Sequence, residues 1–146
     1  MSERDMSFYV VDIFIAIDKI KRYTSKFTNS DDFFRSEMEW DAALRMLQLM
    51  GDAINILLDY NLLEKSYRRV VDFRNQIVHG YFSIDEKIVW EVVTKKIKDI
   101  EKDLLKLVLK NKMNLFPAIE AAIKENSLNQ SILKNLERLK KTLNHG

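Results

Sequence analysis

The shortage of turn-forming residues limits the fold of this chain more than any other feature. Its 146 residues include three glycines and one proline. A fold built from β-strands needs many tight turns, which rely on these two residue types. The apolar share of 47% and the charged share of 32% are typical of a globular protein with a hydrophobic core. The composition therefore predicts an all-α fold, and the length suits a single domain over residues 1–146.

Apolar residues recur at helical spacing along most of the chain and predict an up-down helical bundle. The expected helices lie near 6–23, 30–60, 66–80 and 83–107, and shorter helices form a C-terminal helical extension at 113–146. The first of these helices is apolar around most of its girth, so it needs more than one neighbour to cover it. We expect the core to cover one side of it and a partner subunit to cover the other.

Several residues mark where helices begin, cross and end. Ser30, followed by two aspartates, is typical of a helix start. Gly51 lies in the middle of a predicted helix at a cost of about 1 kcal/mol relative to alanine, which indicates a close helix crossing. Gly80 is expected to end the third helix in the left-handed conformation. Ser83 and Glu86 form a capping-box pattern for the fourth helix.

Missing and rare residue types exclude several functional classes. There is no cysteine, so disulfides, thiolate metal sites and a cysteine nucleophile are excluded. With two histidines, a multi-histidine metal site within one chain is not expected, and neither is a cofactor. No apolar run has the length of a membrane span, and the start MSERDMSF lacks the form of a signal peptide. We expect a cytoplasmic protein without a membrane partner.

Charge is distributed unevenly along the chain. Residues 1–86 carry 11 Lys/Arg and 15 Asp/Glu, whereas residues 87–146 carry 13 and 7. A lysine-rich half is usually a solvated helix face. The alternative is a surface that attracts a phosphate backbone or an acidic protein.

The stretch RNQIVHGYF, residues 74–82, gathers residues of catalytic type at the end of a predicted helix. Arg74 and His79 are about 140° apart on an ideal helix, so they can converge only where the helix ends. Histidine titrates near neutral pH and can accept or give a proton. Arginine can hold a phosphate through two hydrogen bonds. Since RNA supplies its own 2′-hydroxyl as nucleophile, this set suits RNA cleavage without a metal.

Cleavage of this kind needs both a base and an acid, and the motif holds one histidine. A two-fold dimer would bring two copies of the motif to one axis. Asn75, four residues before His79, shares its helix face and can support it. Tyr81 leaves the helix beyond the glycine and can fold back over the same spot.

The same residues can also have a purely structural role, and their types and spacing do not exclude it. The pair Arg-x4-His occurs often by chance. His79 can be a helix-capping histidine, and Arg74 can form a surface salt bridge with Asp72 or Glu86. Tyr81 can be an aromatic residue packed over a turn.

A longer stretch carries a family resemblance. VDFRNQIVHGYFSIDEKIVWEVV, residues 70–93, resembles the signature region of the HEPN toxins, specifically the HepT-like branch. Upstream, AALRMLQLMGDAINIL at residues 42–57 is similar to the family's second-helix pattern, with Asp52 where the family usually has glutamate. The resemblance covers about residues 40–95.

The resemblance implies a helical-bundle homodimer, with room for a higher oligomer, that acts as the toxin of a toxin–antitoxin pair. It implies metal-independent cleavage of RNA at the two-fold cleft. The implied antitoxin is a minimal nucleotidyltransferase similar to MntA, which transfers AMP from ATP to a tyrosine and so blocks the cleft. The implied roles are catalysis for Arg74 and His79, support for Asn75, and AMP acceptance for Tyr81.

Two other functions are alternatives. The first is a non-catalytic module that binds substrate for a small nucleotidyltransferase. A sister branch with this role is similar in its Arg-Asn…His-x-Tyr core, but it usually has serine before the histidine and lacks Gly-Tyr-Phe. Val78 precedes His79 here, which favours the toxin branch. The second alternative is a helical interaction protein whose motif is purely structural.

Overall fold

Regular structure in this protein is helical. The computed structural model describes residues 2–80 and 84–145, and these residues contain no β-strand. The helices are α1 (Glu3–Thr24), α2 (Ser30–Arg35), α3 (Glu37–Asp59), α4 (Arg68–His79), α5 (Glu86–Glu91), α6 (Ile97–Lys110), α7 (Phe116–Glu125) and α8 (Gln130–His145), with a 3-10 turn η1 (Lys65–Tyr67) and a π-helical turn η3 (Val92–Lys96). None of the described helices is long and apolar enough to cross a membrane. The predicted all-α bundle is confirmed.

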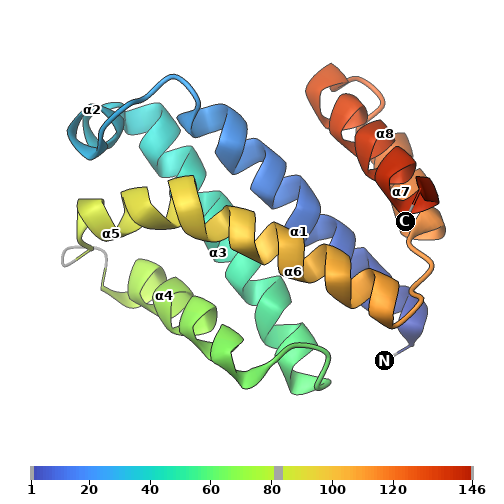
Figure 1. Cartoon of the computed structure of the whole chain (residues 1–146). Helices are drawn as coiled ribbons and strands as arrows, with labels where there is room; N and C mark the ends of the chain where they lie inside the picture. The colour runs from blue at the N-terminus through green and yellow to red at the C-terminus, as the bar shows by residue number, and fades with distance from the viewer. Residues whose placement is uncertain (1, 81–83, 146) are drawn as a thin grey trace.

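The bundle is arranged around α1. Figure 1 shows α1 and α3 side by side, with the continuous run of α5, η3 and α6 crossing them. α4 packs on α3 at one flank, and the α7–α8 pair packs on α1 at the opposite flank. Buried apolar residues extend along α1 from Met6 to Ile20. The second neighbour that this wide apolar face requires is therefore the α7–α8 pair of the same chain, where we expected a partner subunit.

The long second helix that the sequence predicts is two helices, so that prediction is wrong. Ser36 separates α2 from α3 with φ −87° and ψ 84°. The break directs Phe33 into the core, where its ring centroid lies 5.6 Å from Phe27, 5.2 Å from Trp40 and 5.8 Å from Trp90. We refer to these four rings as the aromatic cluster. Aromatic pairs at such distances stabilise the fold beyond the gain from burial. This stabilisation offsets the loss of hydrogen bonds where the helix is interrupted.

The two glycines singled out by the sequence behave differently. Gly51 lies where α3 crosses α4, which confirms the predicted close crossing. Gly80 ends α4 as predicted, but its φ of −141° is not left-handed. Its N–H donates to the Gln76 carbonyl at 2.8 Å, so the helical hydrogen-bond pattern continues to the last residue. The left-handed position after α3 is Asn61, with φ 59°.

The start of α5 also differs from the prediction. Ser83 lies outside the described residues, and α5 begins at Glu86. Asp85 caps it, because its side chain accepts a hydrogen bond from the Lys87 N–H at 2.8 Å. The run then widens into η3, where the Thr94 hydroxyl donates to a backbone carbonyl one turn earlier.

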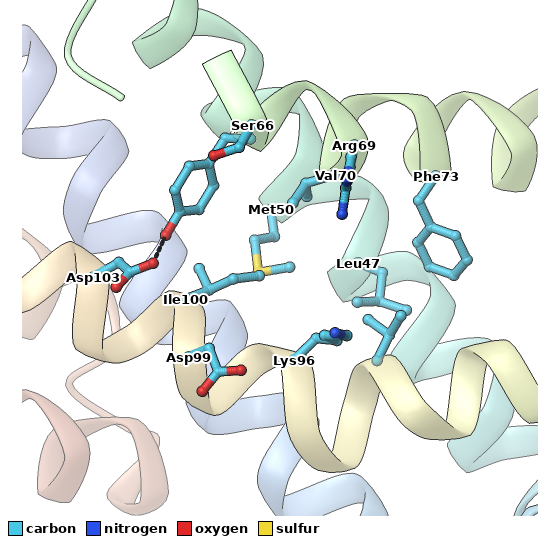
Figure 2. Close-up of a pocket in the computed structure, with 12 residues that line it drawn as sticks. Leu47, Met50, Ser66, Arg69, Val70, Phe73, Lys96, Asp99, Ile100 and Asp103 are labelled. Carbon is cyan, nitrogen blue, oxygen red and sulfur yellow. Dashed lines mark hydrogen bonds between the residues drawn. The ribbon is translucent and has the colours of Figure 1, made fainter. Parts of the chain in front are cut away.

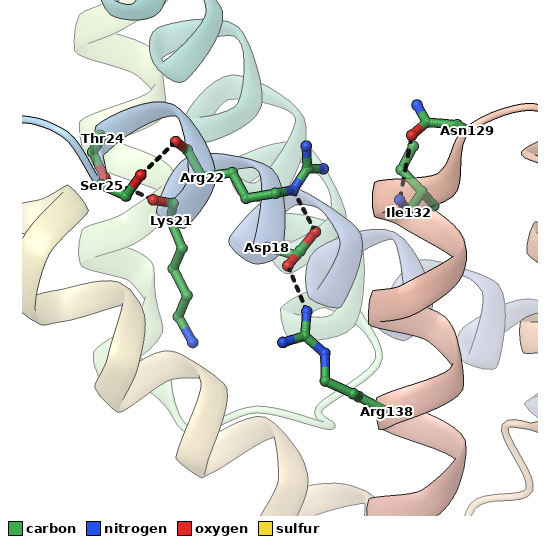
Figure 3. Close-up of polar contacts among 8 residues, drawn as sticks. All are labelled: Asp18, Lys21, Arg22, Thr24, Ser25, Asn129, Ile132 and Arg138. Atoms are coloured by element: carbon green, nitrogen blue, oxygen red, sulfur yellow. Dashed lines mark hydrogen bonds and ion pairs between the residues drawn. The ribbon is translucent and has the colours of Figure 1, made fainter.

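A buried acid joins the C-terminal helices to the bundle. Asp18 on α1 accepts a hydrogen bond from Arg22 Nε at 3.0 Å and lies 3.5 Å from a terminal nitrogen of Arg138 on α8 (Figure 3). The Asp18 side chain is 11% exposed. A carboxylate so deeply placed needs charged partners, and α8 supplies one of them.

Candidate functional site

The side chain of Arg74 lies directly on the backbone of α3. A Cβ atom at Gly51 would come within 2.5 Å of Arg74 Cβ and 2.8 Å of Arg74 Cγ. Contacts that short force a neighbour to move, so a larger residue at position 51 would push α4 outward. The absence of a side chain at Gly51 therefore fixes where the stem of Arg74 lies.

Asp52, the next residue of α3, is the charge partner of this arginine. Arg74 Nε lies 3.1 Å from Asp52 Oδ1. Its N–H does not point at the carboxylate, so the contact is an ion pair without a hydrogen bond. The partner is neither Asp72 nor Glu86, the two acids that the sequence suggested.

The guanidinium keeps donors for a ligand. The Arg74 side chain is 21% exposed. Its terminal nitrogens donate to no side chain or carbonyl in the described ranges. A fixed guanidinium with unused donors is suited to bind an anion such as phosphate.

His79 is the last residue of α4, and its side chain is exposed. No hydrogen bond or ion pair engages its imidazole within residues 2–80 and 84–145. Asn75, one turn earlier, is also exposed and lies on the same helix face. The imidazole is therefore open to a ligand, with an amide beside it.

The structure places Arg74 and His79 apart on α4. Arg74 lies against α3, whereas His79 stands at the open end of the helix. No hydrogen bond joins the two side chains among the described residues. Tyr81, the predicted third member of the group, lies outside the described residues.

Asp52 is the residue that sequence reasoning undervalued. It stood out there only as a departure from a family pattern, and no role followed from it. The available signal was its place beside Gly51, because a residue next to a helix crossing lies at the edge of the contact. Such a residue can reach a side chain of the crossing helix.

Ligands for a metal ion do not gather in this part of the molecule. Within the described ranges, His, Cys, Asp and Glu side chains form no group of three or more that could hold a metal. The candidate functional groups on α4 are one imidazole, at its end, and one guanidinium, midway along it. These two groups can transfer a proton and bind a phosphate.

Fold and site together define a class: helical bundles that carry an arginine and a histidine on one helix. The sequence profile of the ribonuclease HepT-like family matches residues 13–107, which is more than half of the chain. The chain belongs to this family, within the HEPN superfamily. The match runs from α1 into α6, so it includes both site residues and leaves α7 and α8 outside.

Individual relatives agree with this family. A protein of Methanocaldococcus jannaschii named "gamma-glutamylcyclotransferase and putative RNase" is 31% identical over 136 residues, 86% of this chain. This chain spans 60% of the length of that relative. A protein of Thermococcus cleftensis named "probable ribonuclease HepT" is 29% identical over 102 residues, 68% of this chain and 92% of the relative. No solved structure matches the chain.

Proposed function

We propose that this chain is a metal-independent endoribonuclease in which Arg74 binds the scissile phosphate and His79 transfers protons. Family membership and the ribonuclease names of the relatives support an RNA substrate. The geometry of α4 carries the assignment of roles. Arg74 is seated on Gly51 with unused donors, and His79 is exposed at the end of the same helix.

The proposed chemistry uses a nucleophile from the substrate. The 2′-oxygen of RNA attacks the neighbouring phosphorus, and the bond from phosphorus to the 5′-oxygen of the next nucleotide breaks. His79 accepts the proton of the 2′-hydroxyl, and Arg74 stabilises the negative charge that grows on the phosphate oxygens. A second imidazole protonates the departing 5′-oxygen. The products are a 2′,3′-cyclic phosphate and a 5′-hydroxyl.

A second copy of the chain supplies the second imidazole in this proposal. Three exposed apolar residues follow the length of α3: Met38 near its start, Leu49 midway and Tyr60 just after its end. Their exposed fractions are 83%, 40% and 47%. Each is separated from the next by eleven residues, about three helical turns, so they lie on one face. Asp52 follows Leu49 by three residues and borders this stripe. Pairing of two copies along the stripe would bring two Arg74–Asp52 pairs toward one axis.

The proposed control is AMP transfer to Tyr81 by a minimal nucleotidyltransferase antitoxin of the MntA type. An AMP group adds a negative phosphodiester and a bulky base two residues from His79. Its phosphate would compete for Arg74 with the phosphate of RNA. The chain would then be the toxin of the pair, arresting growth alone and harmless beside its antitoxin.

The decisive test is RNA cleavage in EDTA by the full chain purified without antitoxin. We expect the wild type to leave 2′,3′-cyclic phosphate ends and to spare the same sequence made of DNA. His79→Ala should slow cleavage at least about a hundredfold, while His145→Ala, at the other histidine, should retain it. Cleavage by His79→Ala at the wild-type rate refutes the site. No cleavage by an unmodified wild type favours the alternative of a substrate-binding module for a nucleotidyltransferase.

The control step is tested by mass spectrometry after incubation with ATP and the antitoxin. The control variant Tyr60→Phe removes the exposed tyrosine that follows α3. Wild type and this control should both gain an AMP group. Tyr81→Phe should gain none and should keep its cleavage activity in the presence of the antitoxin. An AMP group on Tyr81→Phe would assign the modification to another residue.

A further inference from the structure

A pocket of about 450 Å³ separates α4 from the helical run of η3 and α6. Its floor is apolar, formed by Leu47 and Met50 of α3 and Ile100 of α6 (Figure 2). Phe73 of α4 forms one wall (Figure 2). Pockets for small molecules have volumes of about 300–1,000 Å³ with mostly apolar linings and a few polar groups. Arg74 does not line this pocket, so it is distinct from the site described above.

Two cations enter the pocket from opposite walls. Arg69 comes from α4 and Lys96 from the last residue of η3 (Figure 2). Neither side chain forms an ion pair or hydrogen bond with any residue the structure describes. Cations at protein surfaces are often left single, but two facing each other across an apolar pocket suit one phosphate group.

Two acidic side chains, Asp99 and Asp103, also line the pocket (Figure 2). Asp103 accepts a hydrogen bond from the Tyr67 hydroxyl, and burial together with this bond raises the pKa of Tyr67 well above its usual range. Asp99, three residues after Lys96, has no such partner in the described ranges. A ligand for this pocket therefore combines an anionic group with hydrogen-bond donors. A fatty acid has no donors to offer, whereas a nucleotide has both.

The backbone of the pocket wall is unusual at the same point. Val92 and Lys96, the first and last residues of the π-helical turn η3, both line the pocket. π-Helical turns within α-helices occur often at functional sites, because the extra residue redirects side chains. Here the turn presents one apolar and one cationic side chain to the same space.

We infer that this pocket binds a nucleotide unit, with its phosphate between Arg69 and Lys96, its base against Phe73 and its donors toward Asp99. The unit is either a free nucleotide or one residue of an RNA strand. The second case rests on the proposed ribonuclease function and would give the enzyme a base-binding subsite beside its catalytic helix.

Binding is measured by calorimetry on the full chain carrying His79→Ala, which prevents consumption of RNA. The probes are AMP, CMP, GMP and UMP, with inorganic phosphate and a short single-stranded RNA. We expect at least one nucleotide to bind more tightly than phosphate. Arg69→Gln and Lys96→Gln should each weaken that binding at least tenfold. The matched controls Lys95→Gln and Lys98→Gln change exposed lysines of the same helical run outside the pocket and should leave it unchanged.

The outcomes are separable. Equal affinity for phosphate and nucleotides, no binding at millimolar nucleotide, or equal loss in the control variants each overturn the inference. Competition between RNA and the nucleotide assigns the pocket to a strand, and its absence assigns the pocket to a free nucleotide. Loss of nucleotide binding in Arg69→Gln together with cleavage by His79→Ala at the wild-type rate would support the pocket and refute the proposed function.

Discussion

The two flanks of the bundle are packed to different degrees. On the C-terminal flank, α8 buries Ile132, Leu136 and Leu139 toward α1 and α7. On the opposite flank, α4 buries only Val71 and Ile77 among its residues, and it leaves a pocket between itself and α6. Segments with few buried apolar contacts open at low free-energy cost, and ligand-binding elements are drawn from them. From this comparison we expect α8 to contribute more to stability and α4 to be the flank that binds a ligand.

Charged contacts on the two flanks differ in the same sense. The acid that joins α8 to α1, Asp18, is buried and has two arginine partners. The cation that rests on α3, Arg74, has one charged partner among the described residues, Asp52, which is 47% exposed. On the α8 flank the buried charge is paired within the fold, whereas on the α4 flank the guanidinium has hydrogen-bond donors available to a ligand.

The largest expected effect is on catalysis at the α4 flank. His79→Ala should lower the rate of RNA cleavage about 10²–10⁴-fold, because it removes the group that transfers protons. Its free energy of unfolding should change by less than about 0.5 kcal/mol, since the side chain is exposed. Parallel cleavage assays and denaturation curves measure both. A large loss of stability would contradict the division between the flanks.

The largest effect on stability is expected at the α8 flank. Leu136 is fully buried. Leu136→Ala should lower the free energy of unfolding by about 2–5 kcal/mol through lost burial and a cavity. Cleavage measured at a temperature where the variant is folded should stay near the wild-type rate. If cleavage falls together with stability, the flanks are coupled and the comparison fails.

Gly51→Ala tests the seat of Arg74. In the middle of a helix this substitution usually stabilises by about 1 kcal/mol. Here the added Cβ meets Arg74, so we expect destabilisation of about 1–3 kcal/mol and slower cleavage. Gln48→Ala on the same helix is the control and should change stability by less than about 0.5 kcal/mol. A stabilised, fully active Gly51→Ala would show that α4 does not depend on this close approach.

Asp52→Asn should slow cleavage about tenfold, which corresponds to about 1.4 kcal/mol of transition-state stabilisation. Asp52 positions Arg74 rather than touching substrate in the proposed mechanism, and Asp52→Glu should restore most of the rate. Stability should change by at most about 1 kcal/mol, because the pair is partly exposed. Separate measurement of kcat and KM distinguishes a positioning role from a structural one, which would leave both unchanged in the folded enzyme.

Arg138→Ala is expected to have the smallest effect. Its side chain is 71% exposed, so its ion pair with Asp18 should contribute at most about 1 kcal/mol. Chemical denaturation measures this, with Lys134→Ala on the same helix as the control. A larger loss would show that the buried acid depends on α8 as well as on Arg22.

The sequence was sufficient for the fold class and for the approximate bounds of α1 and α4. Periodic apolar residues and few turn residues predicted an all-α bundle, and Gly80 marked the end of α4 correctly. The break at Ser36 could not be predicted, because it depends on Phe33 reaching Trp40 and on Trp90 far along the chain. Local propensity contains no information about such contacts.

For the site, the sequence predicted the residue types but not their surroundings. Arg74 and His79 were named from spacing and resemblance, and their catalytic roles remain predictions. The pairing of Arg74 with Asp52 follows from the crossing of two helices, which spacing along one helix cannot reveal. In the sequence, Arg69 and Lys96 look like ordinary exposed charges. Only the fold shows that they line facing walls of one pocket.

The π-helical turn η3 corrects the phase of the run from α5 to α6. The buried residues Val89, Val93 and Ile97 follow one another in steps of four. Eight residues of an α-helix turn about 80° beyond two full turns, so the first and last of these would face different directions. The wider turn absorbs that excess, and both ends of the run face one core. Deleting one residue there, such as Thr94, would restore α-helical pitch and rotate Trp90 out of the aromatic cluster.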